Sequence, residues 1–104
     1  MATEVDMNPV EYTLSIISNK WKILIIYWLL RNEVMRYSEL KRSLNGVTHK
    51  MLSLGLKQLE QDNIITRKQY DQIPPKVEYR ISSKGRSLVP IISALCNWGT
   101  DNMQ

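Results

Sequence analysis

Hydrophobic residues recur at helical spacing in the middle of the chain. Leu52, Leu56 and Leu59 are separated by four and three positions, so they share one face of a helix and leave the opposite face polar. A shorter helical pattern precedes this one, and the Asn45-Gly46 pair between the two is typical of a turn. We therefore expect two helices joined by a turn over residues 38–62.

The hydrophobic period changes to two after these helices. Val77, Tyr79 and Ile81 alternate with polar residues, which indicates a strand with one buried face. The segment Gln72-Ile73-Pro74-Pro75 separates this strand from an earlier one, so we expect a β-hairpin over residues 64–82. Two helices joined by a turn and followed by a hairpin are the arrangement of a winged helix-turn-helix, a module that reads DNA.

Three further elements are predicted before these helices. Asn8 can cap a helix over residues 8–18, which follows a flexible arm at residues 1–7. A second helix, over residues 20–30, is apolar nearly all round and is therefore expected to be the central buried helix. We interpret residues 34–37 as a short strand that pairs with the hairpin.

The last predicted helix spans residues 84–102, and we expect it to bend at Pro90. Its apolar residues occupy more than one stripe, which a terminal helix cannot bury entirely against a small domain of its own chain. The excess indicates either a homodimer held by the first and last helices or a groove of the same subunit that this helix covers. We favour the homodimer. The residues expected in its interface are Val10, Leu14, Ile17, Leu88, Ile91, Ile92, Leu95 and Trp98.

Together these patterns predict an α+β fold that is mostly helical, in one domain spanning residues 1–104. It is a winged helix-turn-helix with a small antiparallel hairpin and with dimerisation helices at both ends.

Charge is uneven along the chain. From Arg36 to Arg86 there are eleven basic and five acidic residues (+6), and the remainder has three basic and five acidic residues (−2). Positive charge therefore gathers where a polyanion would bind, although a solvated basic face is the alternative.

Other classes of function find little support in the sequence. Cys96 is the only cysteine, which excludes an intrachain disulfide or a cysteine-built zinc site and suits a reducing cytoplasm. The N-terminus lacks the apolar segment of a signal peptide, and the longest apolar run, Ile23–Leu30, is too short to cross a membrane. Because we find no nucleophile with a base, no phosphate loop and no set of metal ligands, we expect neither an enzyme nor a cofactor.

Several short motifs follow one another in order over nearly all of residues 8–100. They are Asn8-Pro9-Val10-Glu11, Asn19-Lys20-Trp21 followed by Leu24, Arg36-Tyr37-Ser38-Glu39-Leu40, Leu52 through Asp62, Pro74-Pro75-Lys76-Val77-Glu78-Tyr79, Gly85-Arg86-Ser87-Leu88 and Leu95-Cys96-Asn97-Trp98-Gly99. With these motifs the chain resembles the HxlR-type bacterial transcription regulators, which are winged helix proteins near the MarR group. The resemblance implies a homodimer that places two recognition helices in successive major grooves, with the wings flanking them.

The chain departs from this family at two places. Many relatives carry a cysteine where Asn8 stands, and in several it senses oxidants or electrophiles, so that thiol switch does not carry over. We expect Cys96 to be a buried small hydrophobe rather than a replacement sensor. The second departure is Leu54-Gly55 in the recognition helix, where relatives usually have long polar or basic residues. Gly55 lowers helix stability, and it either permits a close approach of the backbone to DNA or weakens binding.

The candidate DNA contacts lie on the helix-turn-helix and the hairpin. Thr48 is expected to cap the recognition helix and to contact a phosphate as a second role. His49 is either a DNA contact, as the resemblance implies, or a solvated surface residue. Trp21, Trp28 and Trp98 are expected in the core rather than stacked on bases. The full set of expected DNA-binding residues is Arg36, Lys41, Arg42, Thr48, His49, Lys50, Ser53, Lys57, Lys68 and Lys76.

The sequence therefore predicts a sequence-specific, DNA-binding transcription regulator. We expect a repressor that binds an inverted-repeat operator in double-stranded DNA as a homodimer in the cytoplasm. The alternative is a winged helix that binds other proteins and has no affinity for DNA, for which the Leu54-Gly55 pair gives some support. A small-molecule effector is compatible with a dimer of this kind, but no residue specifies one.

Overall fold

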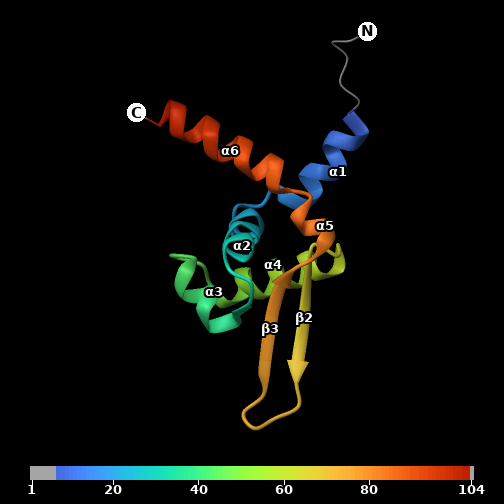
Figure 1. The fold of residues 1–104 in the computed structure, drawn as a ribbon, viewed down its shortest axis with the longest axis vertical. Coiled ribbons are helices and arrows are strands. Elements are labelled where there is room, and N and C mark those ends of the chain that lie inside the picture. Colours follow the sequence, from blue (N-terminus) through green and yellow to red (C-terminus); the bar gives the residue numbers. More distant parts are fainter. Residues whose placement is uncertain (1–6, 104) are drawn as a thin grey trace.

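The computed structural model describes residues 7–103, so residues 1–6 of the predicted arm lie outside the described residues. The chain is mostly helical and carries a small sheet (Figure 1). Its elements, in order, are α1 (Met7–Ile17), α2 (Lys20–Arg31), β1 (Met35–Arg36), α3 (Tyr37–Ser43), α4 (His49–Gln61), β2 (Ile65–Tyr70), β3 (Lys76–Ile81), α5 (Ser83–Arg86) and α6 (Val89–Asn102).

The sheet has three antiparallel strands in the order β1-β3-β2. The hairpin strands pair from Ile65 with Ile81 to Tyr70 with Lys76. On the other side of β3, Met35 of β1 lies opposite Tyr79, which confirms the predicted short strand before the helix-turn-helix. This pairing ties the start of α3 to the hairpin, so the wing is anchored to the body of the molecule.

The core is built around α2, as its apolar sequence predicts. Ile25, Ile26 and Leu29 of α2 are fully buried and belong to the same cluster as Leu52 and Leu59 of α4. The helical spacing of the leucines in α4 therefore does bury one face of that helix against α2. The hairpin also contributes to this cluster. The buried residues that it supplies are Ile64, Ile65, Tyr79 and Ile81.

The prediction of one bent C-terminal helix is wrong, because the segment forms two helices. Ser82 caps the short helix α5 by accepting a hydrogen bond from the Gly85 backbone N–H at 2.9 Å. Pro90 then lies in the first turn of α6 rather than in a helix interior. A proline is favourable there because its missing N–H would have had no intrahelical partner. At the other end of the chain, α1 begins at Met7, so Asn8 lies inside the helix and not at its cap.

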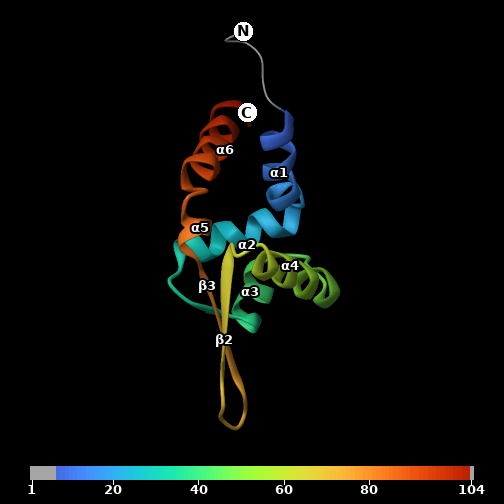
Figure 2. The same ribbon diagram turned by 90° about the vertical axis from the view of Figure 1, so that its right-hand side faces the viewer.

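Helices α1 and α6 project from the body at the end opposite the wing (Figures 1 and 2). The molecule is consequently long, with extents of 59 × 33 × 24 Å and a radius of gyration of 15.3 Å. A compact chain of about 100 residues has a radius of gyration of about 13 Å. The two projecting helices account for this difference in shape and leave much of their surface without contacts in the same chain.

Candidate nucleic-acid interface

Helix α4 has one buried and one exposed side. Thr48 caps it by accepting a hydrogen bond from the Met51 backbone N–H at 3.1 Å, as the sequence predicts. Lys50 and Lys57 are exposed and Ser53 is half-buried on the side opposite the leucine face. This helix therefore presents hydroxyl and ammonium groups to solvent, while its leucine face packs against α2. Such a helix can present donors to phosphates and to base edges in a major groove.

Gly55 lies on the buried side of α4, where it allows close packing between helices. A methyl group at this position would lie 3.1 Å from Ile25 Cδ1 and 3.6 Å from Lys22 Cγ, both on α2. The idea that this glycine permits an approach of the backbone to DNA is therefore wrong. Lys22 is itself buried and donates a hydrogen bond from Nζ to the Ser15 carbonyl oxygen at 2.9 Å, near the end of α1. The Lys22 hydrogen bond therefore links the end of α1 to the packed pair of helices α2 and α4.

Tyr37 and His49 meet at the start of α4. The tyrosine hydroxyl is hydrogen-bonded to His49 Nδ1 and lies 3.4 Å from the His49 carbonyl oxygen. The two ring centroids are 5.3 Å apart in an edge-to-face arrangement. Because one ring nitrogen is occupied by this contact, the orientation of the imidazole is set by α3, and Nε2 remains for a further partner. Sequence reasoning singled out His49 but missed the residue that orients it.

Helix α3 supports this end of the interface. Its first residues follow β1 directly, and the Glu39 carboxylate accepts a hydrogen bond from the Arg36 backbone N–H at 2.8 Å. Arg36, Lys41 and Arg42 are all exposed, at the two ends of this short helix. All three side chains are therefore accessible from solvent, as a contact with a phosphate backbone would require.

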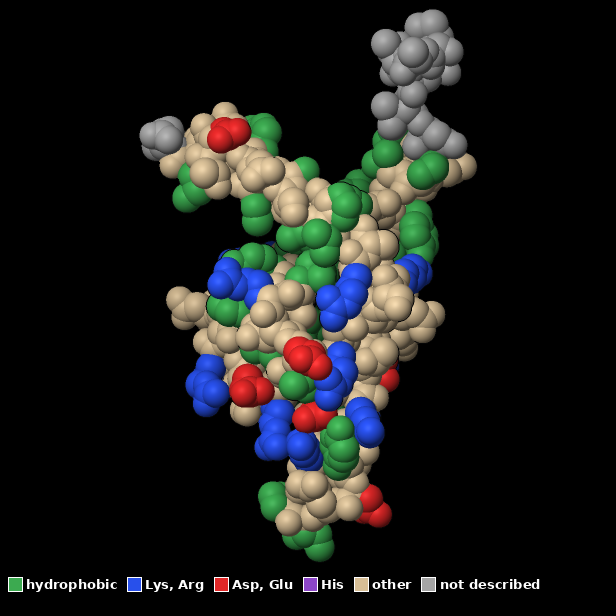
Figure 3. All heavy atoms as spheres, in the orientation of Figure 1, with side chains coloured by type: hydrophobic (Ala, Val, Ile, Leu, Met, Phe, Trp, Pro, Cys, Tyr) green, Lys and Arg blue, Asp and Glu red, His purple; other side chains and the backbone are tan. Residues whose placement is uncertain are grey.

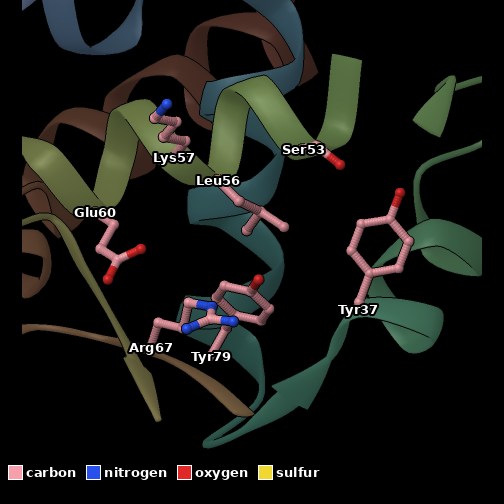
Figure 4. Close-up of a pocket in the computed structure, with 7 residues that line it drawn as sticks. All are labelled: Tyr37, Ser53, Leu56, Lys57, Glu60, Arg67 and Tyr79. Atoms are coloured by element: carbon pink, nitrogen blue, oxygen red, sulfur yellow. The ribbon is translucent and has the colours of Figure 1, made fainter. Parts of the chain in front are cut away.

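A shallow hollow of about 230 Å³ lies between one side of α4 and the sheet (Figure 4). In Figure 4 it lies between the polar side of α4 and the side chains that rise from the start of α3 and from the hairpin. Its charged members have different signs, so the hollow is not a simple anion site. It is lined by Tyr37, Ser53, Leu56, Lys57, Glu60, Arg67 and Tyr79.

The wing is ordered by a cluster around Glu78 of β3. The Glu78 carboxylate accepts a hydrogen bond from the Tyr70 hydroxyl at 2.8 Å and forms ion pairs with Lys76 at 3.3 Å and Arg80 at 3.2 Å. The hydrogen bond from Tyr70, together with the two cations, lowers the pKa of Glu78 below its ordinary value of 4.5. Lys68 and Lys76 also lie over the Tyr70 ring, with Nζ at 4.9 and 4.8 Å from its centroid.

Lysine and arginine side chains gather on the lower half of the molecule, over the hairpin and the neighbouring helices (Figure 3). The predicted DNA-binding residues are thus split into three groups that lie on α3, on α4 and on the wing. Lys68 is exposed, whereas Lys76 is half-buried and paired with Glu78. The structure therefore leaves Lys68 more accessible than Lys76.

The predicted dimer residues separate into two sets. Leu88 and Ile92 are each only 8% exposed and belong to the core of their own chain, so their expected place in the dimer interface needs correction. Leu95 and Trp98 are exposed by 51% and 71%. The placement of Trp98 in the core of its own chain is therefore wrong, and so is the expected burial of Cys96, which is exposed. On α1, Leu14 is exposed while Val10 and Ile17 are half-buried.

Residues 7–103 lack two features that other classes of function would need. No group of three or more histidine, cysteine or acidic side chains there could hold a metal ion. None of the helices in this part of the chain is long and apolar enough to cross a membrane.

The fold and the exposed basic side of α4 define the class of protein, which is the winged helix-turn-helix DNA-binding regulators. The chain belongs to the HxlR-like helix-turn-helix family, which matches its residues 16–104. This confirms the resemblance seen in the sequence. The family and its named relatives are transcription regulators rather than enzymes.

Individual relatives agree with this assignment. An uncharacterized HTH-type transcriptional regulator of Halalkalibacterium halodurans is 49% identical over 94 residues, covering 90% of this chain and 83% of the relative. YdzF of Bacillus subtilis strain 168, also an uncharacterized HTH-type transcriptional regulator, is 52% identical over 91 residues. That match covers 88% of this chain and 84% of YdzF. Among solved structures, the redox regulator HypR in its reduced form has a TM-score of 0.87 at 41% identity, covering 92% of this chain and 94% of that one.

Proposed function

We propose that the protein is a homodimeric repressor that binds an inverted-repeat operator, with α4 as the recognition helix. The observation that carries this proposal is the polar, basic side of α4, which stands opposite the leucines that fix the helix to α2. Lys50, Ser53 and Lys57 would contact bases or phosphates in the major groove, and Thr48 and His49 would contact the groove edge. The remaining proposed contacts are with the backbone and the adjacent minor groove, through Arg36, Lys41, Arg42, Lys68 and Lys76.

The partner in this proposal is a second copy of the chain. Exposed apolar side chains occur on both projecting helices, including Leu14 of α1 and Ile91, Leu95 and Trp98 of α6. Val10 and Ile17 lie half-buried beside Leu14 and would complete the α1 side of the interface. A two-fold axis would allow each α6 to pack against α1 of the other copy, so that the same surface is used on both chains.

Repression would follow from occupancy alone. A dimer that covers two major grooves occupies DNA that a polymerase needs, so no additional activity is required at a promoter. We place this activity in the cytoplasm, the compartment that holds a bacterial chromosome. Transcription in vitro from a promoter with an inserted operator should fall as the protein is added, and stimulation of that promoter would contradict repression.

The cheapest test of DNA binding is its dependence on salt. Affinity for random duplex DNA should fall linearly with salt on logarithmic axes, because each phosphate contact releases a counterion. A site selected from random sequence should bind roughly a thousandfold or more tightly than random duplex. A winged helix that binds only proteins would show neither behaviour, and that result would favour the adaptor alternative.

A further inference from the structure

Leu54 occupies an unexpected place on α4. Its side chain is 51% exposed, in contrast to Leu52 and Leu56, which are buried in the same helix. It follows Lys50 by four positions and precedes Lys57 by three, so all three side chains share one side of the helix. The middle of the proposed DNA-reading side is therefore apolar, and ammonium groups flank it in both directions along the helix.

The apolar surface continues from Leu54 toward the start of α2. Leu54 lines a small hollow together with Trp21 and the exposed Met51. A single exposed leucine is common on protein surfaces and needs no explanation by itself. Its position between two lysines is informative, because any polyanion held by those lysines would be pressed against this side chain.

We propose that Leu54 contacts the C5 methyl group of a thymine in the major groove, which makes a thymine necessary at one position of each half-site. The inference rests on the proposed function, since it requires α4 to enter the groove. The thymine methyl is the only apolar group that base pairs present on that side. Leucine has no donor or acceptor, so guanine, adenine or cytosine at this position would lose water from a polar edge without gaining a hydrogen bond.

This contact would give the chain a reading rule that depends on its own residue. Long polar side chains at this point of a helix read base edges through hydrogen bonds, whereas leucine can only read shape and a methyl group. The lysines would supply affinity for any duplex, and Leu54 would supply discrimination at one base pair. Affinity and sequence preference are thus assigned to different side chains of the same helix side.

The test replaces thymine by deoxyuridine, which removes the methyl group and leaves every hydrogen-bonding atom in place. The binding site is first selected from random duplexes with the full chain, and each thymine of the site is then replaced singly. At one thymine per half-site, affinity should fall about fourfold, which is the effect of one methyl group. Replacement in both half-sites together should lower affinity about fifteenfold.

Two variants assign the methyl effect to a residue. Leu54→Ala should bind the thymine and deoxyuridine sites with nearly equal affinity, because the methyl group has lost its partner. Met51→Ala, which truncates the neighbouring exposed side chain, should keep the difference between the two sites. Circular dichroism should show that both variants keep the helix content of the parent, since both side chains are exposed.

The outcomes separate this inference from the function on which it rests. If no site is selected and random duplex binds without salt dependence, the DNA-binding function itself fails, and Leu54 becomes part of a protein-binding surface. If a site is selected but every deoxyuridine replacement is silent, only the inference about Leu54 fails. A methyl effect that persists in Leu54→Ala would likewise overturn it, because another side chain would then be the reader.

Discussion

At the scale of single residues, Lys50 and Lys57 are the side chains with the most direct expected effect. Both are exposed on the side of α4 that lies opposite the core. Lys50→Ala or Lys57→Ala should weaken DNA binding by about 1 kcal/mol per half-site and lower the salt slope of the dimer by about two units, because one phosphate contact is lost from each copy. The melting temperature should stay nearly constant, since neither side chain packs in the core.

A matched control for these lysines is Arg86→Ala. Arg86 is also exposed and basic, but it belongs to α5, at the end of the body from which α6 projects. It should leave affinity and salt slope unchanged in a fluorescence anisotropy titration. Equal losses in all three variants would show that binding follows total charge rather than the side of α4.

The Tyr37–His49 contact predicts a defined histidine tautomer. If the tyrosine hydroxyl donates to Nδ1, the neutral ring carries its proton on Nε2, where it can donate to DNA. His49 is the only histidine, so the nitrogen signals of a histidine-labelled sample need no assignment. We expect the Nε2–H tautomer in the parent and a mixture in Tyr37→Phe. A parent spectrum dominated by the Nδ1–H form would contradict this direction of donation.

The sequence was sufficient for residues whose role follows from spacing, and insufficient for those whose role depends on a distant neighbour. The buried leucines of α4 and the Thr48 cap could be predicted because neighbours along a helix determine both. Tyr37 and His49 are twelve positions apart, and only the turn between α3 and α4 brings them together. Gly55 is a similar case, because its place on the buried side of α4 depends on the packing against α2 and not on its neighbours in the sequence.

At the scale of elements, periodicity predicted where helices and strands lie but not where the last helix breaks. The change of period after α4 correctly indicated the hairpin, and the short strand before α3 was correctly paired with it. In the C-terminal segment, the helical spacing of apolar residues continues from α5 into α6, although the backbone helix is interrupted at Ser87 and Leu88. The hydrophobic period contains no signal for the break, because Leu88 fits the apolar stripe while it packs into the body between α5 and α6. The signal is Pro90, which is favourable in the first turn of a new helix.

The wing offers a prediction about pH. The Tyr70 hydrogen bond and the two cations lower the pKa of Glu78 in the folded protein below the ordinary value of 4.5. The ionised carboxylate therefore favours the folded wing at pH values above about 4.5, and this stabilisation is lost as pH falls through the lower folded pKa. Glu78→Gln should melt at a lower temperature than the parent near neutral pH, and the two melting temperatures should converge in acid.

Two observations complete the test of the wing. Tyr70→Phe removes the largest contribution to the lowered pKa and should raise the pKa of Glu78 toward its ordinary value, as followed by carboxyl carbon shifts. Thr66→Ala, on an exposed position of the same hairpin, serves as the control and should leave that pKa unchanged. A difference in melting temperature that persists unchanged in acid would show that Glu78 acts through packing rather than through its charge.

At the scale of the whole molecule, the sequence predicted an excess of apolar surface but assigned it incorrectly in part. Helical spacing placed Leu88 and Ile92 on the same stripe as Leu95, yet the first two fasten α6 to its own body. The division depends on where α6 leaves the body, which is a property of the folded chain. The exposed portion, which includes Leu95 and Trp98, lies farther along the projecting helix.

The last prediction joins this surface to the form of the operator. One recognition helix reads only a few base pairs, which is too little for a useful site in a genome. Two copies related by a two-fold axis would place their α4 helices one helical turn of DNA apart, about 34 Å, or a small multiple of it. The operator should then be an inverted repeat. Leu95→Glu should give monomers, because a buried, unpaired carboxylate costs several kcal/mol.

The matched control is Thr100→Glu, which adds the same charge to an exposed position of α6 that lies five residues beyond Leu95 and therefore on a different side of the helix. Sedimentation at micromolar concentration should show a dimer for the parent and for this control, and a monomer for Leu95→Glu. The monomer should lose affinity for the inverted repeat far more than affinity for random duplex, because each chain keeps its own basic side of α4. A parent that sediments as a monomer and still binds a lone half-site tightly would exclude this arrangement.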